Sequence, residues 1–460
     1  MLLLINPPQK DFFEKKHFNI SRQENQTVSL PLGLAYIAAS VRKAGYRVEC
    51  LDLNVEEFTI EDVIKRINSK DIKFIGLTST TPLMKNTIKI ASEIKSKTNA
   101  KIILGGIHIT SEPLETISLN CFDIGVLGEG EETIVKILAN QRLEEVNGIV
   151  FKKGKKIILN PTKPTSTDLN DLPFPARDLF PLDKYKPSNH RKLGAEDTYN
   201  VLIASRGCPF GCKFCASKKM FGKKVNFRSP SSVINEIKQV IDVTKSNKIM
   251  FYDDTMTANH KFITEFTSLI KKEKLDITWG SNTRLDTINN DLLNIMHKTG
   301  YKRAFVGVES GDDEILKSMN KCLTIRQISQ GIEKLKAFGI EISASHIIGA
   351  PGETRDSIIK TINFAIKNKT NFAHFYVFTP DPGADYYELL KKKGVIKPME
   401  WLDYDNMIRK GTYLLKEKIP FDELIDFTKL AYIFNNISHR EAPIRNILNN
   451  FFKPSKILLN

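Results

Sequence analysis

Short apolar runs alternate with longer amphipathic runs along most of the 460-residue chain. The short runs have the length of buried strands, and the longer runs repeat apolar residues at the spacing of helices. Strands that alternate with helices favour parallel sheets whose faces are covered by those helices. The chain therefore predicts an α/β protein, and its length suggests about three units.

The first series of alternating strands and helices covers residues 1–142. Its strands are predicted at 2–5, 46–53, 74–78, 101–104 and 123–127. Its helices are predicted at 32–43, 60–67, 84–95 and 131–138. This alternation predicts an open, doubly wound parallel sheet. A ligand of such a sheet binds at the carboxyl ends of the strands, where this chain carries small and hydroxyl residues.

A second series of alternating strands and helices covers residues 197–390. Its strands are predicted at 200–204, 248–252, 277–281, 304–308, 343–348 and 374–378. Its helices are predicted at 233–243, 262–270, 292–296, 328–338 and 358–366. Six β/α units predict a partial (β/α)6 barrel related to the eight-unit TIM architecture, with its chemistry at the carboxyl ends of the strands.

Two segments lie outside these two series of strands and helices. Residues 143–196 begin as a hairpin and continue as a turn-rich stretch, which predicts a connector over the surface of both domains. Residues 391–460 have mixed polarity and predict a small α-rich tail.

Charge and composition argue against several classes of protein. Lys and Arg number 68 against 53 Asp and Glu, a net charge of +15, but lysine-rich pieces such as 151–156 are scattered between acidic stretches. That distribution favours a solvated basic surface over a nucleic-acid site, with an anionic partner or a membrane surface as the alternative. No apolar run reaches the length of about 18 residues that a transmembrane segment needs. The apolar start at 1–5 predicts a buried strand and not a leader, so we expect a cytoplasmic protein.

Three of the six cysteines follow the first strand of the second series. Cys208, Cys212 and Cys215 are separated by three and then two residues. Thiolates on so short a loop favour zinc or an iron–sulfur cluster, and Gly207 and Gly211 let the backbone curl around it. A structural zinc ion needs a fourth ligand, which the loop lacks. Three ligands on a four-iron cluster would leave one iron open for a small molecule.

The segment Cys208-Pro-Phe-Gly-Cys212-Lys-Phe-Cys215 resembles the signature of the radical S-adenosylmethionine (SAM) enzymes. Phe214 matches the aromatic residue that this family has before its third cysteine. The resemblance implies that the cysteines hold a 4Fe-4S cluster whose open iron binds the amino and carboxylate groups of SAM. It also implies a one-electron reductant, such as flavodoxin or ferredoxin, and cleavage of SAM to a 5′-deoxyadenosyl radical.

Polar residues also follow the second and third strands of the barrel. Asp253 and Asp254 resemble the family's acidic element near the amino group of SAM, and the sequence leaves open which of them has that role. A helix cap is the alternative for this pair. Arg284 is suited to bind a carboxylate through two nitrogens, and a surface salt bridge is its alternative.

The fourth and fifth strands end in further elements of the resemblance. Glu309, with Ser310 beside it, lies where related enzymes hold the ribose hydroxyls of SAM, and a structural ion pair is the alternative. Gly349 and Gly352 belong to a glycine-containing element beside the adenine, for which a tight turn with a helix cap is the alternative. The loop at 378–387 follows the sixth strand and is expected to face the substrate or to pack.

The first series of strands and helices limits the resemblance to one subgroup of the radical SAM enzymes. A flavodoxin-like domain before a radical SAM barrel is similar to the cobalamin-binding subgroup, with matching segments at 31–34, 105–108 and 128–132. The residues implied to bind that cofactor are Thr78, Ser79, Gly105, Gly106, Gly128 and Glu129. The chain has no Asp-x-His-x-x-Gly segment, the signature of cobalt ligation by histidine. We therefore interpret His108 as a wall residue and not as a cobalt ligand.

Together the two domains imply a cobalamin-dependent methyltransferase that acts on an unactivated carbon of a small-molecule or lipid-linked substrate. Ring formation or an oxidative rearrangement on the same fold is the alternative. Methylthiolation is disfavoured because its enzymes carry three further N-terminal cysteines, whereas Cys50 and Cys121 are isolated here. A non-catalytic cofactor-binding protein is less consistent with the complete cysteine triplet.

Overall fold

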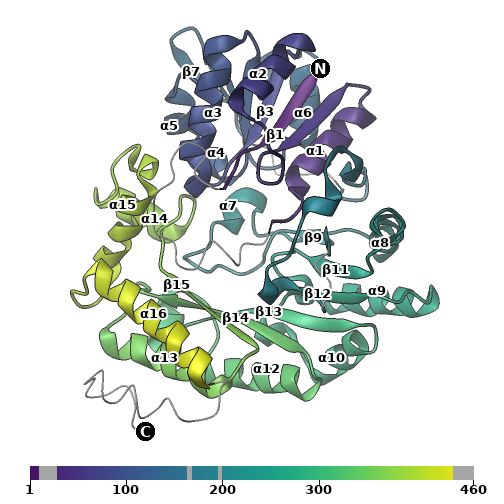
Figure 1. Ribbon diagram of the computed structural model, residues 1–460. Coiled ribbons are helices and arrows are strands. Elements are labelled where there is room, and N and C mark those ends of the chain that lie inside the picture. The colour runs from purple at the N-terminus through teal and green to yellow at the C-terminus, as the bar shows by residue number, and fades with distance from the viewer. Residues whose placement is uncertain (10–27, 163–167, 195–198, 439–460) are drawn as a thin grey trace.

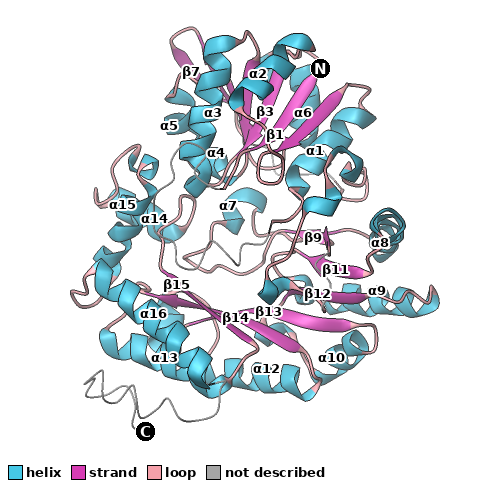
Figure 2. Cartoon of the chain, viewed as in Figure 1, coloured by secondary structure: helices cyan, strands magenta, loops and turns pink. Residues whose placement is uncertain are grey.

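The computed structural model describes residues 1–9, 28–162, 168–194 and 199–438. Figure 1 shows the first sheet, in purple and blue, above the second sheet, in teal and green. The short helix α7 (Ser217–Phe221) lies between them. Figure 2 shows helices on the side of the second sheet that faces away from the first.

The first sheet has the strand order β2-β1-β3-β4-β5-β6-β7. Its strands are β1 (Leu2–Asn6), β2 (Val48–Asp52), β3 (Phe74–Thr78), β4 (Lys101–Gly105), β5 (Ile124–Val126), β6 (Ile149–Lys153) and β7 (Lys156–Leu159). Strands β1 to β5 pair in parallel, which confirms the predicted doubly wound sheet. The hairpin predicted after them forms β6 and β7 and pairs antiparallel with β5. The order reverses between β1 and β3, and ligands of such sheets bind at this switch point.

Helices cover both faces of the first sheet. They are α1 (Leu32–Lys43), α2 (Ile60–Ser69), α3 (Met84–Lys97), α4 (Ile107–Ser111), α5 (Pro113–Ser118) and α6 (Glu131–Leu138). Leu3 and Ile5 of β1 pack into the core under α2 to α5, whereas Leu2 and Leu4 pack into the core under α1 and α6. Alternate residues of a strand point to opposite faces, so burial on both faces explains the continuous apolar run of β1.

The second sheet has the strand order β15-β14-β13-β12-β11-β8, with every pair parallel. Its strands are β8 (Asn200–Leu202), β11 (Lys248–Phe251), β12 (Thr278–Asn282), β13 (Tyr301–Glu309), β14 (Glu341–Ile348) and β15 (Phe372–Val377). Its helices are α8 (Pro230–Thr244), α9 (His260–Lys272), α10 (Asn290–His297), α11 (Asp313–Ser318), α12 (Ile325–Ala337) and α13 (Arg355–Asn368). The six strands lie in chain order with β8 and β15 at the edges, which confirms the predicted partial barrel.

The helices of the second sheet pack on only one of its faces. Phe251, Trp279 and Val306 point to that face and pack with apolar residues of α8, α9, α10 and α12. Because consecutive strands are neighbours, each right-handed crossover places its helix on the same side. The opposite face of the second sheet lies toward the first sheet (Figure 1).

The helical tail contacts both domains. It follows α14 (Asp385–Lys392) and contains η8 (Glu400–Leu402), α15 (Tyr404–Arg409), η9 (Lys410–Leu414) and α16 (Phe421–Ser438). Trp401 and Met407 are buried in the core under α2 to α5 of the first sheet, whereas Leu424 and Phe427 of α16 pack on β15 and α13. The predicted tail therefore forms a strap between the domains, and its residues 439–460 lie outside the described part. Among the described helices, α16 included, none is long and apolar enough to cross a membrane.

Two short helices of the first domain, α4 and α5, were not predicted from the sequence. They follow β4, and α4 buries the polar residues His108, Thr110 and Ser111. A polar buried face has no amphipathic signature, because apolar periodicity is what predicts a helix from sequence.

Candidate active site

The carboxyl edges of the two sheets meet around α4 and α7. Helix α4 follows β4 of the first sheet, and it packs on α7, which follows the cysteine loop of the second domain. The hydroxyl of Thr110 lies 3.8 Å from Sδ of Met220 in α7. A Cβ atom on Gly128, after β5, would lie 3.6 Å from the carbonyl oxygen of Met220. The two predicted cofactor sites therefore adjoin one interface.

The cysteine loop begins after β9 (Ser205–Arg206), which pairs with β10 (Asn226–Phe227). Gly207 has a φ of +99°, and a Cβ there would collide with the carbonyl oxygen of Lys224. Only glycine fits this turn, because both the backbone angle and the close approach exclude a side chain. Between Cys208 and Cys212, the carbonyl oxygen of Gly211 accepts from Nδ2 of Asn320 at 2.7 Å.

The cysteine side chains of the loop are half-buried, and each sulfur has a polar neighbour. These neighbours are the Ser217 N–H at 3.5 Å from Cys215, Arg284 Nη1 at 3.9 Å from Cys212 and Thr255 Oγ1 at 3.8 Å from Cys208. Burial raises the pKa of Cys215 to about 11, and it also raises the pKa of Cys212. Metal binding at these thiols must therefore displace protons.

The donor set fits a cluster better than a single ion. Among the described residues, no three His, Cys, Asp or Glu side chains are gathered so as to hold one metal ion. In a cluster each cysteine binds a different iron, so the three sulfurs need not converge on one point. Hydrogen bonds to the sulfurs are a feature by which proteins tune such clusters. The arrangement gives no support to the structural zinc alternative.

The two adjacent aspartates after β11 have different surroundings. Asp253 is fully buried, and its carboxylate accepts from the Ala204 N–H at 3.0 Å and from the Ser205 hydroxyl at 2.5 Å. Burial raises the pKa of Asp253 to about 6. Asp254 is half-buried and accepts from the hydroxyl of Ser217 at 2.5 Å, and Ser217 lies two residues after Cys215. Neither caps a helix, since Asn259 is the N-cap of α9.

Arg284 is buried against the cysteine loop. Its Nε and Nη2 bind the two carboxylate oxygens of Asp286 at 2.8 and 3.0 Å, and Nη2 also donates to the carbonyl oxygen of Lys321 at 2.6 Å. The guanidinium carbon lies 3.8 Å from the centre of the Phe210 ring. The predicted two-nitrogen contact forms with a carboxylate of the chain itself, so Arg284 holds the loop in place.

Phe214 packs with Ile315, Met319, Ile347 and Ala350 in a small apolar cluster between the loop and the carboxyl ends of the strands.

Glu309 forms a buried ion pair at the carboxyl end of β13. Its Oε1 lies 2.9 Å from Nζ of Lys321, and both side chains are less than one-tenth exposed. Glu309 has a φ of +69°, a strained backbone for a residue with a side chain, at an irregularity of register between β13 and β14. Ser310 is fully buried, and its hydroxyl accepts from the Asp312 N–H and lies 3.2 Å from the Thr361 hydroxyl.

The glycine element after β14 is built around a carboxylate that the sequence analysis missed. Glu353 is fully buried, and its Oε2 accepts from the N–H groups of Gly349 and Ala350 at 2.7 and 2.9 Å. Gly349 and Gly352 have φ angles of +82° and +88°, which favours glycine at both positions. Burial raises the pKa of Glu353 to about 8. In the sequence, the sign of this role is an acidic residue within an otherwise apolar turn. The next residue, Thr354, caps a helix, and that reading of the segment gave no reason to single out Glu353.

The strand ends of the first sheet expose backbone where a flat ligand needs it. Gly106 has a φ of +99°, and a Cβ there would lie 2.7 Å from the Ser79 carbonyl oxygen and 2.9 Å from the Thr78 hydroxyl. Gly105 and Gly128 are half-exposed, and no atom lies within 3.5 Å of a Cβ built on either. Gly106 therefore serves the close packing of the chain on Ser79, whereas glycine at 105 and 128 leaves backbone that a flat ligand such as a corrin ring can approach closely.

His108 is fully buried in the wall behind these strand ends. Its Nδ1 lies 3.0 Å from the hydroxyl of Thr81, and its ring meets the Trp401 ring edge-on at a centroid distance of 4.2 Å. Within the described residues its Nε2 has no hydrogen-bond partner. Burial lowers the pKa of His108 to about 3, so the ring is neutral.

A buried ion-pair network joins the two domains beside the cysteine loop. Arg206 lies two residues before Cys208, and its Nη1 and Nη2 pair with Glu129 and Glu131 of the first domain at 2.6 Å each. Arg206 also lies over the ring of Tyr36 at 5.1 Å. The carboxylate of Glu129, which was predicted to bind the cofactor, is therefore used by Arg206. Sequence alone cannot pair residues so far apart.

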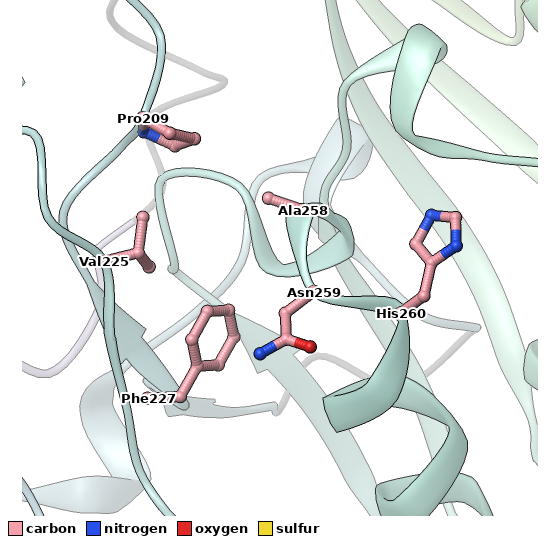
Figure 3. Close-up of a pocket in the computed structure, with 6 residues that line it drawn as sticks. All are labelled: Pro209, Val225, Phe227, Ala258, Asn259 and His260. Atoms are coloured by element: carbon pink, nitrogen blue, oxygen red, sulfur yellow. The ribbon is translucent and has the colours of Figure 1, made fainter.

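A surface cavity of about 590 Å³ lies next to the cysteine loop. Figure 3 shows the residues that line it, which are Pro209, Val225, Phe227, Ala258, Asn259 and His260. Pro209 follows Cys208 in the loop, but the predicted cofactor residues are absent from the lining. The cavity therefore lies beside the candidate site and not within it.

Comparisons with known proteins assign both domains. Residues 202–365 match the radical SAM superfamily, and residues 25–138 match the B12 binding domain. An uncharacterized methyltransferase, PH0819, of Pyrococcus horikoshii is 33% identical over 85% of this chain and 86% of its own length. An anaerobic magnesium-protoporphyrin IX monomethyl ester cyclase of Rubrivivax gelatinosus is 28% identical over 83% of this chain and 70% of its own.

A solved structure has the same fold. It is the radical S-adenosylmethionine methyltransferase TsrM of Kitasatospora setae, determined with tryptophan substrate and a SAM analogue. The TM-score is 0.71 at 14% identity, and the match covers 96% of this chain and 89% of that protein. At this identity the likeness concerns the fold alone.

Proposed function

Because the chain belongs to the radical SAM superfamily, among the enzymes that carry an N-terminal B12-binding domain, we propose that it methylates an unactivated carbon. The cofactors of these two domains are a 4Fe-4S cluster with SAM and cobalamin. The observation that carries the proposal is the shared interface, where the carboxyl ends of both sheets meet beside the cysteine loop. Two cofactors that act on one substrate need such proximity.

Each cofactor has candidate residues in this chain. Cys208, Cys212 and Cys215 would bind three irons of the cluster. We assign Asp254 to the amino group of SAM, because the carboxylate of Asp253 is fully buried and already used by the Ala204 N–H and the Ser205 hydroxyl, whereas Asp254 is half-buried beside the cluster loop. Glu309 remains the candidate for the ribose hydroxyls, and its ion pair with Lys321 through Oε1 would hold the carboxylate in position.

Cobalamin is proposed to lie on the strand ends of the first sheet. Bare backbone at Gly105 and Gly128 would face the corrin, with Thr78 and Ser79 at the neighbouring strand. When bound, the two cofactors supply the radical and the methyl group. His108 is turned to Thr81 and Trp401, which supports its role as a neutral wall residue.

The chain's own contribution is to hold positive charge beside the cluster and to fix the two domains. Arg284 and Lys321 lie next to Cys212, where cationic groups favour the thiolate. Arg206 ties the start of the cluster loop to Glu129 and Glu131 of the first domain. These contacts would keep the distance between the cofactors constant through the reaction.

The test distinguishes methyl transfer from ring formation, which the cyclase relative keeps open. A methyltransferase of this type consumes SAM in two ways, so substrate should yield both 5′-deoxyadenosine and S-adenosylhomocysteine. A cyclase should yield 5′-deoxyadenosine alone. With methyl-labelled SAM, a product without label would contradict methyl transfer. The Cys208→Ala variant is the matched control, because it should form no 5′-deoxyadenosine.

A one-electron reductant such as flavodoxin or ferredoxin is proposed to dock near the cluster loop, in the cytoplasm. Lys213, Lys223 and Lys224 are exposed around this loop and suit an acidic carrier. Replacing all three with Gln should slow 5′-deoxyadenosine formation with the protein reductant but not with a small chemical one. The substrate itself is a small or lipid-linked molecule.

A further inference from the structure

We propose that Arg191 forms an anion-binding subsite for the substrate, on the face of the second sheet that its helices leave uncovered. The substrate would then carry a carboxylate or a phosphate. Calling this ligand the substrate rests on the proposed function, whereas the anion site itself rests on the geometry below. We call this side of the sheet the inner face.

The inner face is defined by alternation along β13. Ala304, Val306 and Val308 belong to the core under the helices. Phe305 and Gly307 must therefore point the opposite way. Parallel pairing continues this face across the sheet, from Phe305 to Ser343 and Phe372 and from Gly307 to Ser345 and His374.

The inner face is polar and partly open, unlike a second core. Phe305, Ser345 and His374 are half-buried, and Tyr376 is 54% exposed. Nε2 of His374 lies 3.1 Å from the hydroxyl of Ser343. Hydroxyl and imidazole groups on an accessible face between two cofactor domains indicate a place for a polar ligand.

Arg191 lies over this face in a defined position. It ends the 3-10 turn η5 (Asn189–Arg191), which belongs to the connector. Its guanidinium carbon is 4.7 Å from the centre of the Phe305 ring and 5.1 Å from that of the Tyr252 ring. Stacking on aromatic rings uses the faces of a guanidinium and leaves its N–H edges for a planar anion.

The turn that carries Arg191 is itself anchored on the sheet. Nη1 of Arg303, at the start of β13, donates to the carbonyl oxygen of Asn189 at 3.2 Å. Arg303 is in turn held by Glu341 of β14. A charged side chain on an anchored turn is positioned before a ligand arrives, which lowers the entropy that binding costs.

Arg191 differs from the other half-buried and buried arginines around the site. Arg206 and Arg284 each pair with carboxylates of the chain. Among the described residues, none forms an ion pair or a hydrogen bond with the guanidinium of Arg191. Burying a charge without a partner is costly, so an anion from outside the chain is the expected partner.

His374 cannot take over this role. Burial, with a smaller effect of Arg191, lowers the pKa of His374 to about 4. Its ring is therefore neutral at pH 7, and the other cation described on this face, Arg303 over the Phe372 ring, is already paired with Glu341, so Arg191 is left to meet an anion.

The subsite lies on a line that leads to the cofactor elements. Phe305, Gly307 and Glu309 follow one another at alternate positions of β13. Four residues of strand span roughly 13 Å between the Arg191 level and the Glu309 level. A Cβ on Gly307 would collide with the Glu309–Lys321 pair, so that pair closes the far end of the line. A substrate held by its anion at Arg191 would point its other end toward the cluster.

The test measures binding of small probes to the full, cofactor-loaded chain by calorimetry. The probes are benzoate, phenyl phosphate and the neutral benzamide. Arg191→Met removes the charge, Arg191→Lys keeps a charge without the planar edge, and Arg326→Met at an exposed arginine of α12 is the control. Comparing benzoate with phenyl phosphate shows which anion the site prefers.

We expect one anion to bind saturably and more tightly than benzamide, and Arg191→Met to weaken it by about tenfold or more. Arg191→Lys should weaken it less, and Arg326→Met should not change it. The proposal is overturned if neither anion binds saturably, or if Arg191→Met binds the anion as well as the wild type. Formation of 5′-deoxyadenosine by the wild type is measured separately, so anion binding without SAM cleavage would refute the proposed function and leave the subsite standing.

Discussion

Replacing Arg206 with Met should uncouple the two domains. Arg206 is less than one-tenth exposed, and so are its two partners, Glu129 and Glu131. Burial alone would lower the pKa of Arg206, but the two carboxylates outweigh it and raise the pKa. Methionine keeps an unbranched apolar side chain in place of the arginine stem and removes the charge, so two buried carboxylates lose their counter-ion at once.

The structure sets the size of this effect. Removing one partner of a buried ion pair costs about 3–5 kcal/mol, because the remaining charge stays buried without compensation. An exposed pair such as Arg142 with Glu145, whose side chains are 76% and 55% exposed, contributes about 0–1 kcal/mol. Arg142→Met is therefore a matched control for the loss of an arginine.

The assay is urea unfolding of the full chain followed by tryptophan emission. The chain has two tryptophans, with Trp279 in the core of the second sheet and Trp401 in the core of the first. Phe substitutions at one or the other give a reporter for each domain. With about 2–3 kcal/mol per M of urea, Arg206→Met should lower a midpoint by about 1–2 M.

Neutralising the carboxylates as well should restore stability. In the triple variant R206M/E129Q/E131Q none of the three side chains is charged, so no buried charge is left without a partner. Its urea midpoint should therefore return toward that of the wild type. The reasoning fails if Arg206→Met unfolds like Arg142→Met, or if the triple variant is no more stable than the single one.

Three further substitutions test other parts of the site. Glu353→Gln should make the free energy of unfolding less dependent on pH. Burial raises the pKa of Glu353 from 4.5 to about 8 in the folded state, so the wild type loses up to about 1.4 kcal/mol of stability per pH unit as the pH rises through that range. Melting curves of the two proteins should therefore diverge from pH 5 to pH 8. Lys321→Met leaves Glu309 buried without its partner and should cost about 3–5 kcal/mol in urea unfolding, whereas Lys321→Met with Glu309→Gln should recover most of it. Trp401→Ala should cost about 3–5 kcal/mol and expose the strap to limited proteolysis, and an unchanged digestion pattern would contradict the packing described for it.

The sheets could be predicted because their signal is local. Strands such as 74–78 are buried on both faces, so their apolar runs are continuous, and the helix at 32–43 has the bounds that its apolar spacing predicts. The cysteine loop carried its own signal in the spacing of three residues. Local patterns of this kind do not depend on which domain packs against which.

The contacts between domains could not be predicted, because they join residues that are distant in the chain. Glu129 was predicted to bind the cofactor from its glycine-rich segment, yet its carboxylate pairs with Arg206, 77 residues away. Arg284 was expected to bind a carboxylate, and it does, but the carboxylate belongs to Asp286. A residue type limits which partners are possible, and only the fold chooses among them.

The tail shows the same limit for packing. Its mixed polarity predicted helices but not their place. Trp401 is buried against His108 of the first domain, and Leu424 is buried against the second. A segment that buries a few residues on each of two domains has no amphipathic face of its own, so periodicity cannot reveal it.

The central claim is that one chain holds a cluster and a corrinoid at a shared interface. Its most direct test is anaerobic reconstitution of the full chain with iron, sulfide and cobalamin, followed by measurement of iron, bound corrinoid and 5′-deoxyadenosine formed from SAM. We predict that the wild type binds both groups and that Cys208→Ala loses the iron and the 5′-deoxyadenosine but keeps the corrinoid, while Cys322→Ala keeps all three. A wild type that binds no corrinoid, or a Cys208→Ala variant that still forms 5′-deoxyadenosine, would contradict the account.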